Sequence, residues 1–150
     1  MDSITKTRMQ MALKLAKKSL RNGDVPVGCV IFDSNKNCIG TGFNSCIKNN
    51  DPSAHAEVLA IRNACKHLNT LFLTDVVLYV TLEPCSMCEA LIKEARIKKV
   101  FFGAYNLRKE IKDKKNFSHI FQSDSKYRFY GGFEEESCAK VLKEFFAKLR

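Results

Sequence analysis

Residues 76–82 form an almost continuous apolar run that ends directly before Glu83 and Pro84. A run of this length between polar segments predicts a buried strand. Proline cannot continue a central strand, but it fits well in the first turn of a helix. The chain is therefore expected to pass from a strand into a helix at Pro84, and this helix should continue to about Ala95.

Helical and strand-like patterns alternate along the rest of the chain. Helical spacing of apolar residues predicts three more helices, over residues 9–20, 58–68 and 138–149. The first should end at Asn22-Gly23, and Ser53 can cap the second. Strand-like runs cover residues 25–32, 37–43, 100–103 and 127–133, and the first two form a hairpin. Residues 44–52 are expected as a turn, and residues 106–124 as a loop or a loop with a short helix. This alternation predicts an α/β layered domain whose hairpin makes the sheet mixed.

The length and composition fit one soluble domain over residues 1–150. The chain has 150 residues, of which 45% are hydrophobic and 27% are charged. No apolar run approaches the roughly 20 residues of a membrane span, and the N-terminus lacks the apolar segment of a secretion signal. Five of the seven cysteines are scattered through apolar segments, which suits reduced thiols better than a disulfide framework. We therefore expect a cytoplasmic protein with no membrane partner.

The formal charge of +9 is distributed unevenly along the chain. Residues 6–21 contain six basic and no acidic side chains, and residues 96–115 contain eight basic and two acidic ones. Residues 24–95, between these blocks, carry a small net negative charge. Two basic flanks would suit a polyanion held on either side of a pocket, which points to nucleic acid. A solvated basic surface without a partner is the simpler alternative.

Two short motifs carry the chemistry, and each opens a predicted helix. They are His55-Ala56-Glu57 and Pro84-Cys85-Ser86-Met87-Cys88. Together they match the HxE and PCxxC signature of zinc deaminases that act on nucleobases. Cysteines three residues apart on a helix share a face, so Cys85, Cys88 and His55 could hold one Zn²⁺ and leave its fourth position to water.

A zinc ion lowers the pKa of bound water and so makes a nucleophile available near neutral pH. Two thiolates offset part of the metal charge, so a nearby base is needed as well. Glu57 would take the proton from the water, deliver it to a ring nitrogen and assist the departure of ammonia. The spacing of His55 and Glu57 does not by itself direct both side chains toward one ion, and that geometry is taken from the signature.

Each motif alone has a simpler interpretation. A CxxC pair is often redox-active or half of a zinc finger, but a redox site would leave His55 and Glu57 without a task. A structural zinc module needs a fourth ligand, and the spacing of His67 and His119 makes both weak candidates. A non-catalytic zinc-stabilised RNA-binding module remains an alternative from another functional class. The combination of both motifs, separated by one helix and one strand, favours the deaminase.

At these residues the chain resembles the cytidine deaminase-like superfamily and, within it, the bacterial tRNA-specific adenosine deaminases. The similar segments are Asp24-Val25-Pro26-Val27-Gly28, Gly42-Phe43-Asn44, residues 51–57, residues 78–85, Phe102-Gly103-Ala104 and Phe145-Phe146. The resemblance implies a three-layer α/β/α sandwich with a mixed sheet of about five strands, usually found as a homodimer. It also implies hydrolytic conversion of adenosine to inosine at the wobble position of a tRNA anticodon loop.

The resemblance assigns a role to individual residues of this chain. One Zn²⁺ would be bound by His55, Cys85 and Cys88, with Glu57 as the proton shuttle. Asn44 would bond to the base, and the main chain around Ala56 would hold the edge of the base. The basic flanks and the aromatic pair Phe145 and Phe146 would contact phosphates and stacked bases.

The chain departs from the family pattern mainly where the substrate is recognised. Asn106 stands where the family commonly has an aspartate, and the basic segment Leu107–Lys115 replaces a loop of small residues. The Asn106 amide can still reach a ribose hydroxyl, but it is neutral, which could loosen the preference for RNA. Glu89 is larger and more acidic than the usual residue after Cys88. A deaminase of a free nucleobase or nucleoside, of the guanine or cytosine type, is therefore the alternative function.

Overall fold

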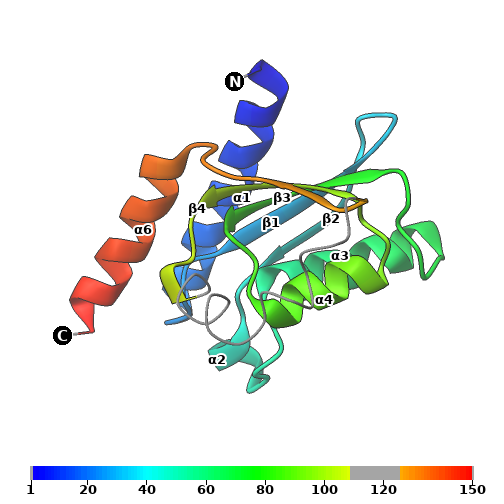
Figure 1. The fold of residues 1–150 in the computed structure, drawn as a ribbon. Coiled ribbons are helices and arrows are strands. Elements are labelled where there is room, and N and C mark those ends of the chain that lie inside the picture. Colours follow the sequence, from blue (N-terminus) through cyan, green and yellow to red (C-terminus); the bar gives the residue numbers. More distant parts are fainter. Residues whose placement is uncertain (1, 109–125, 150) are drawn as a thin grey trace.

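A computed structural model of the chain describes residues 2–108 and 126–149. The helices and strands alternate along most of this length (Figure 1). In chain order they are α1 (Ser3–Arg21), β1 (Gly28–Asp33), β2 (Cys38–Phe43), α2 (Cys46–Asn49), α3 (Ala56–Leu68), β3 (Val76–Leu82), α4 (Ser86–Glu94), β4 (Lys99–Ala104), β5 (Arg128–Tyr130) and α6 (Glu135–Lys148).

The five strands form one mixed sheet in the order β2-β1-β3-β4-β5. The β1–β2 hairpin is antiparallel, and β1 also pairs antiparallel with β3, whereas β3 pairs parallel with β4 and β4 with β5. The parallel strands β3 and β4 are connected through α4, as a parallel crossover requires. The predicted mixed sheet of about five strands is confirmed.

Helices cover both faces of the sheet, with α1 and α6 on one side and α3 and α4 on the other (Figure 1). The central strands supply side chains to both layers because successive residues of a strand point to opposite faces. In β1, Cys29 and Ile31 pack in the α3–α4 core, whereas Val30 and Phe32 pack in the α1–α6 core. The apolar side chains of β3 likewise alternate between the two cores. The three-layer α/β/α sandwich expected from the sequence is confirmed.

The structure corrects several expected boundaries. The predicted strand over residues 25–32 begins only at Gly28, and the strand over 127–133 is limited to Arg128–Tyr130. The turn over residues 44–52 contains the short helix α2. Its N-terminal N–H groups bond to the buried carboxylate of Asp24, with 2.8 Å between Ile47 N and Asp24 Oδ1. The loop expected over 106–124 lies mostly outside the described residues, as does most of Leu107–Lys115.

The expected cap of the second helix is also wrong. Helix α3 has His55 at its N-cap position, not Ser53. The Ser53 hydroxyl donates instead to Asp51 Oδ1 at 2.7 Å, and the Ser53 N–H donates to the same oxygen. Because the Ser53 hydroxyl is engaged in this local turn, it does not cap the helix, and α3 starts only at Ala56. As a result, His55 keeps an extended backbone directly before the helix.

Candidate metal centre and active site

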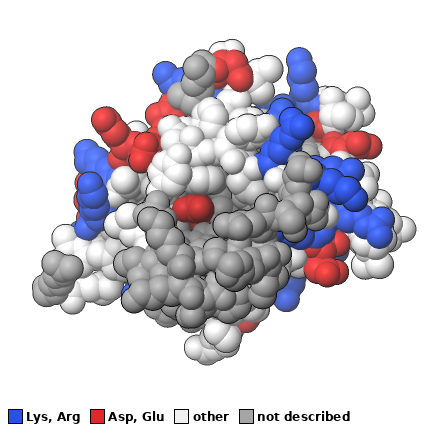
Figure 2. Space-filling model, viewed as in Figure 1, with Lys and Arg blue, Asp and Glu red and all other residues white. Residues whose placement is uncertain are grey.

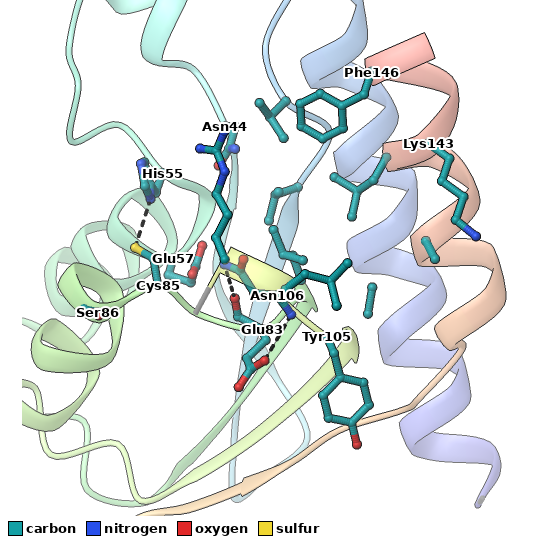
Figure 3. Close-up of a pocket in the computed structure, with 18 of the residues that line it drawn as sticks. Asn44, His55, Glu57, Glu83, Cys85, Ser86, Tyr105, Asn106, Lys143 and Phe146 are labelled. Atoms are coloured by element: carbon teal, nitrogen blue, oxygen red, sulfur yellow. Dashed lines mark hydrogen bonds between the residues drawn. The ribbon is translucent and has the colours of Figure 1, made fainter. Parts of the chain in front are cut away.

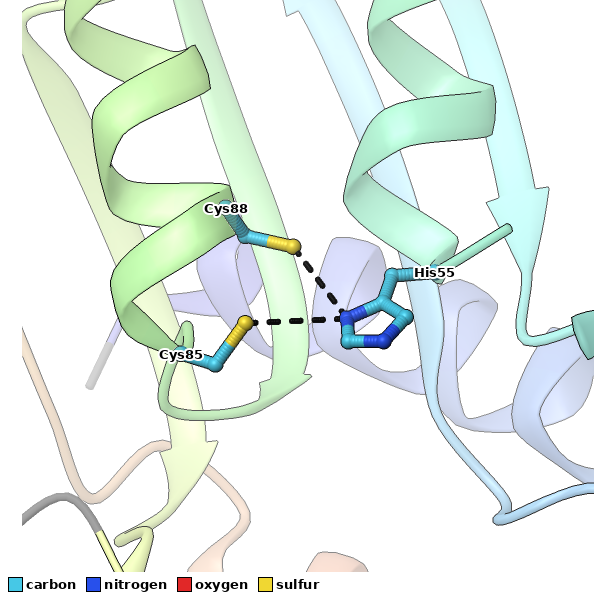
Figure 4. A group of neighbouring side chains, drawn as sticks. All are labelled: His55, Cys85 and Cys88. Carbon is cyan, nitrogen blue, oxygen red and sulfur yellow. Dashed lines mark hydrogen bonds between the residues drawn. The ribbon is translucent and has the colours of Figure 1, made fainter. Parts of the chain in front are cut away.

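The candidate metal centre lies where the starts of two helices meet on the α3–α4 side of the sheet. His55 precedes α3 and Cys85 precedes α4, each with an extended backbone at the N-cap position. Cys88 lies in the first turn of α4 and is buried. Figure 4 shows the two cysteines facing the His55 ring across the gap between these helices. Three residues from distant parts of the sequence are therefore brought together.

The distances among these side chains fit a zinc ion. His55 Nδ1 lies 3.6 Å from Cys85 Sγ and 3.4 Å from Cys88 Sγ. Zinc bonds of about 2.1 Å to nitrogen and about 2.3 Å to sulfur, at a tetrahedral angle, would place these atoms about 3.6 Å apart. All three ligand atoms lie within 4.8 Å of one another. One imidazole and two sulfurs form a donor set that zinc prefers, and they leave one tetrahedral position without a protein ligand.

The two cysteine side chains shift each other's pKa in opposite directions, and such a pair suits a cation. The hydrogen bond from the Cys88 thiol lowers the pKa of Cys85 to about 4, with a further contribution from His55. The same hydrogen bond, together with burial, raises the pKa of Cys88. Bonding to Cys85 also raises the pKa of His55, although burial opposes this. A divalent cation bound by the two sulfurs would allow both of them to ionise, because metal ligands must be deprotonated.

Glu57 lies in the first turn of α3, and its carboxyl group is close to the same centre. The residue is 3% exposed, and burial raises the pKa of Glu57 to about 7. Figure 3 shows its side chain beside His55 and Cys85 at the inner end of a cleft. A carboxyl group in such a site can be protonated or ionised near neutral pH, which suits a group that accepts and returns protons.

The cleft has a volume of about 910 Å³ and is lined mainly by apolar groups. Asn44 lies at its inner end, near His55 and Glu57 (Figure 3). Asn44 Oδ1 accepts the N–H of Ala56 at 2.8 Å. Since its oxygen is engaged, the Asn44 amide can direct its NH₂ group toward a ligand. Ala56 is fully buried and is not among the lining residues, so this N–H orients Asn44.

The opposite wall of the cleft comes from the segment after β4 and from α6. Asn106 and Phe146, both proposed from the resemblance as substrate contacts, line it together with Lys143. Phe145 is not a lining residue; its ring packs edge to face against Phe146, with the centroids 5.2 Å apart. Phe146 therefore lies in the cleft, whereas Phe145 packs against the Phe146 ring and does not line the cleft.

Sequence reasoning missed several residues of the site. Glu83, Tyr105 and Lys143 line the cleft, but nothing in their types or spacing distinguishes them from other surface residues. Only the position of Glu83, two residues before Cys85, could have indicated a role. His67 is exposed on α3 and does not belong to the candidate ligand group. His119 lies outside the described residues.

The chain matches a family model described as the cytidine and deoxycytidylate deaminase zinc-binding region, over residues 2–104. It is 39% identical over 143 residues to a protein of Haemophilus influenzae named tRNA-specific adenosine deaminase, covering 95% of this chain and 83% of the relative. A protein of the same name from Buchnera aphidicola subsp. Baizongia pistaciae is 43% identical over 144 residues, covering 95% and 88%.

Solved structures of deaminases are also similar to this chain. One from a study of tRNA:A34 deaminases that edit A to I at the wobble position has a TM-score of 0.81 and 33% identity, covering 91% of this chain and 99% of that chain. A guanine deaminase from Bacillus subtilis has a TM-score of 0.64 and 37% identity, covering 81% and 76%. The chain therefore belongs to the zinc-binding cytidine and deoxycytidylate deaminase family, and its cofactor is zinc.

Proposed function

We propose that the protein deaminates adenosine to inosine at the wobble position of tRNA, with the zinc ion bound by His55, Cys85 and Cys88. The observation that carries this proposal is the grouping of these three side chains with Glu57 at the inner end of the cleft. The tRNA deaminase relatives, which match 95% of the chain, support the substrate. In this reaction water replaces the exocyclic amine of adenine, and ammonia leaves.

Bound zinc supplies a Lewis acid that makes water nucleophilic near neutral pH. Glu57 takes the proton from this water and passes it to the ring nitrogen next to the carbon under attack. Glu57 then takes the remaining proton from the attacking oxygen and delivers it to the exocyclic amine, so that the bond from carbon to this nitrogen breaks, ammonia leaves and the oxygen becomes the carbonyl oxygen of inosine. The NH₂ group of Asn44 donates to an acceptor on the base, since its oxygen is bound to Ala56.

The dimensions and charge of the cleft support a polymeric substrate. Its volume of about 910 Å³ is near the upper end of the roughly 300–1,000 Å³ range of small-molecule sites, so one base leaves space for neighbouring nucleotides. Lys143 and Arg108 line the cleft and can meet phosphates, and Phe146 offers a ring to a base. An unpaired anticodon loop is a favourable substrate, because flipping a base from it costs little.

The test is incubation of the purified zinc-loaded protein with an anticodon stem-loop that has adenosine at the wobble position. We expect inosine in the product, detected by nucleoside mass spectrometry, and an equal amount of ammonia. A stem-loop with guanosine at that position is the control. Absence of inosine would contradict the proposal.

Deamination of a free nucleobase is the second candidate. The similarity to the guanine deaminase, at 37% identity over most of that chain, is the observation that favours it. The same assay should include guanine, cytosine and adenosine as free substrates. Ammonia released from a free base, with none from the stem-loop, would select this candidate.

We further propose that the chain is one domain, forms a homodimer and is cytoplasmic. The resemblance to the tRNA deaminases supports the dimer, and none of the seven cysteines forms a disulfide, which suits a reducing compartment. Within the described part of the chain, none of the helices is long and apolar enough to cross a membrane. Light scattering coupled to gel filtration should give a mass of twice the 17.0 kDa of one chain.

A further inference from the structure

Glu83 connects the turn before the metal centre with the segment that follows β4. Its main-chain N–H donates to the carbonyl oxygen of Ala104 at 2.8 Å, and its carboxylate Oε1 accepts the main-chain N–H of Asn106 at 3.0 Å. The side-chain amide of Asn106 reaches the main-chain oxygen of Glu83 at 3.5 Å. Figure 3 shows the two residues next to each other, joined by these hydrogen bonds. These bonds continue the parallel pairing of β3 with β4 past its last register pair, Leu82 and Ala104.

The connection joins two parts of the site that have different tasks. Glu83 is two residues from Cys85, which belongs to the candidate metal centre, whereas Asn106 lies on the wall proposed to meet the substrate. Hydrogen bonds from a main-chain N–H to a carboxylate are shorter and stronger than bonds between neutral groups. The carboxylate of Glu83 therefore ties the main chain of Asn106 to the turn that leads to Cys85.

We propose that Glu83 is a positioning residue for substrate recognition and acts through Asn106. By fixing the main chain of Asn106, Glu83 holds the side chain of Asn106 where it can contact the sugar of a nucleotide next to the target base. This inference rests on the proposed function, because it requires a polynucleotide in the cleft. Glu83 itself need not touch the substrate.

A purely electrostatic role makes the opposite prediction. A negative charge in the cleft repels phosphates, so removing it would strengthen RNA binding and lower KM. Loss of positioning would weaken binding and raise KM. Glu83→Gln removes the charge but keeps an oxygen acceptor for the Asn106 N–H, whereas Glu83→Ala removes both. The two variants therefore separate charge from hydrogen bonding.

The experiment measures kcat and KM on the wobble-adenosine stem-loop for wild type, both Glu83 variants and Glu94→Ala. Glu94 is an exposed glutamate at the end of α4, so its variant controls for loss of a carboxylate outside the cleft. For Glu83→Ala we expect a rise in KM of about fivefold to tenfold, the size expected for one lost hydrogen bond. Glu83→Gln should stay within about twofold of wild type, and all variants should keep their zinc.

Two further measurements identify Asn106 as the residue through which Glu83 acts. In an Asn106→Ala background, Glu83→Ala should add almost nothing to KM, because the contact that it supports is already lost. Hydrogen exchange followed by NMR should show faster exchange of the Asn106 amide in Glu83→Ala than in Glu83→Gln. If Glu83→Ala does not fold, Glu83→Asp replaces it, because the shorter side chain withdraws the acceptor and keeps the charge.

Several outcomes would overturn the inference. Additive effects of Glu83→Ala and Asn106→Ala would mean that Glu83 acts independently of Asn106. A lower KM in both Glu83 variants would assign an electrostatic role, and an unchanged KM in Glu83→Ala would remove the positioning role altogether. In all three cases wild-type activity on the stem-loop would leave the proposed function intact. A wild-type protein inactive on the stem-loop would overturn both.

Discussion

His55 and Glu57 face one centre although they are only two residues apart, because α3 begins between them. His55 has φ −74° and ψ 154°, an extended conformation, whereas Glu57 belongs to the first helical turn. The change in backbone conformation turns both side chains to the same side. Cys85 and Cys88 have the same relationship at the start of α4. The motifs allowed these four residues to be predicted from the sequence, but the backbone change that makes their geometry possible could not be derived from spacing.

Replacing Glu57 with glutamine should separate metal binding from catalysis. The amide side chain would fill the same buried space without a carboxyl group to move protons, and Glu57 is not among the candidate ligands. We expect zinc content to stay near one ion per chain and kcat to fall by about 10²-fold to 10⁴-fold, the usual contribution of general acid–base catalysis. Metal analysis and the inosine assay measure the two effects. Loss of zinc from Glu57→Gln would show instead that Glu57 takes part in binding the metal.

Replacing Cys85 with alanine should remove both zinc and activity. Two ligands bind zinc much more weakly than three, and a metal that binds only the folded state stabilises that state. A chelator should therefore lower the melting temperature of the wild type but leave that of Cys85→Ala unchanged. Cys65→Ala is the matched control, because Cys65 is a partly buried thiol on α3 outside the ligand group. Equal zinc content in both variants would contradict the assignment of Cys85.

At the scale of elements, most of the fold could be predicted from apolar patterns. The strand over residues 76–82 has the bounds that its apolar run indicates, and α4 follows Pro84 as expected. The failures have local causes. Helix α2 contains only four residues and is held by Asp24, which is distant in sequence, so its own residues give no helical pattern. Residues 25–27 have strand-like composition, but Val25 and Val27 line the cleft instead of pairing in β1.

The close contact between β2 and the start of α3 makes a glycine necessary in β2. A Cβ atom at Gly42 would lie 2.3 Å from the main-chain oxygen of Ala56 and 2.8 Å from the main-chain nitrogen of Ala60. These are backbone atoms, so the helix itself would have to move. We expect Gly42→Ala to lower the free energy of unfolding by about 1–3 kcal/mol, as overpacking usually does, and to weaken zinc binding by moving His55. Chemical denaturation and zinc competition with a chromogenic chelator measure the two effects.

The control for this prediction is Gly23→Ala. Gly23 has φ +74°, and a Cβ atom there would meet nothing within 4 Å. Alanine at this position costs about 1 kcal/mol because of its positive φ alone. It lies in the turn after α1 and does not line the cleft. Stability should therefore fall in both variants, and zinc affinity only in Gly42→Ala. Equal zinc affinity in the two variants would show that the start of α3 tolerates displacement.

At the scale of the whole molecule, the amount of charge can be counted from the sequence, but its arrangement in space cannot. Figure 2 shows basic side chains along both sides of one face, with acidic groups among them and one acidic group near the middle of the face. Lys143 could not have been assigned to the cleft from sequence, because α6 reaches it only when packed beside β4. Among the described residues, the basic flank over 96–115 contributes Arg108 to the lining of the cleft, and the flank over 6–21 contributes no lining residue.

If phosphates bind at the cleft, KM for the stem-loop should depend strongly on salt. Each phosphate contact to a single strand contributes about 0.7 to the slope of log KM against log salt, so one contact each from Lys143 and Arg108 predicts a roughly sevenfold rise between about 50 and 200 mM. Lys143→Ala should reduce this slope by about 0.7, whereas Lys66→Ala, an exposed lysine on α3, should not. Steady-state kinetics at several KCl concentrations give the slopes. A KM insensitive to salt would contradict a polyanionic substrate, because a free base carries no phosphate for the cleft to bind.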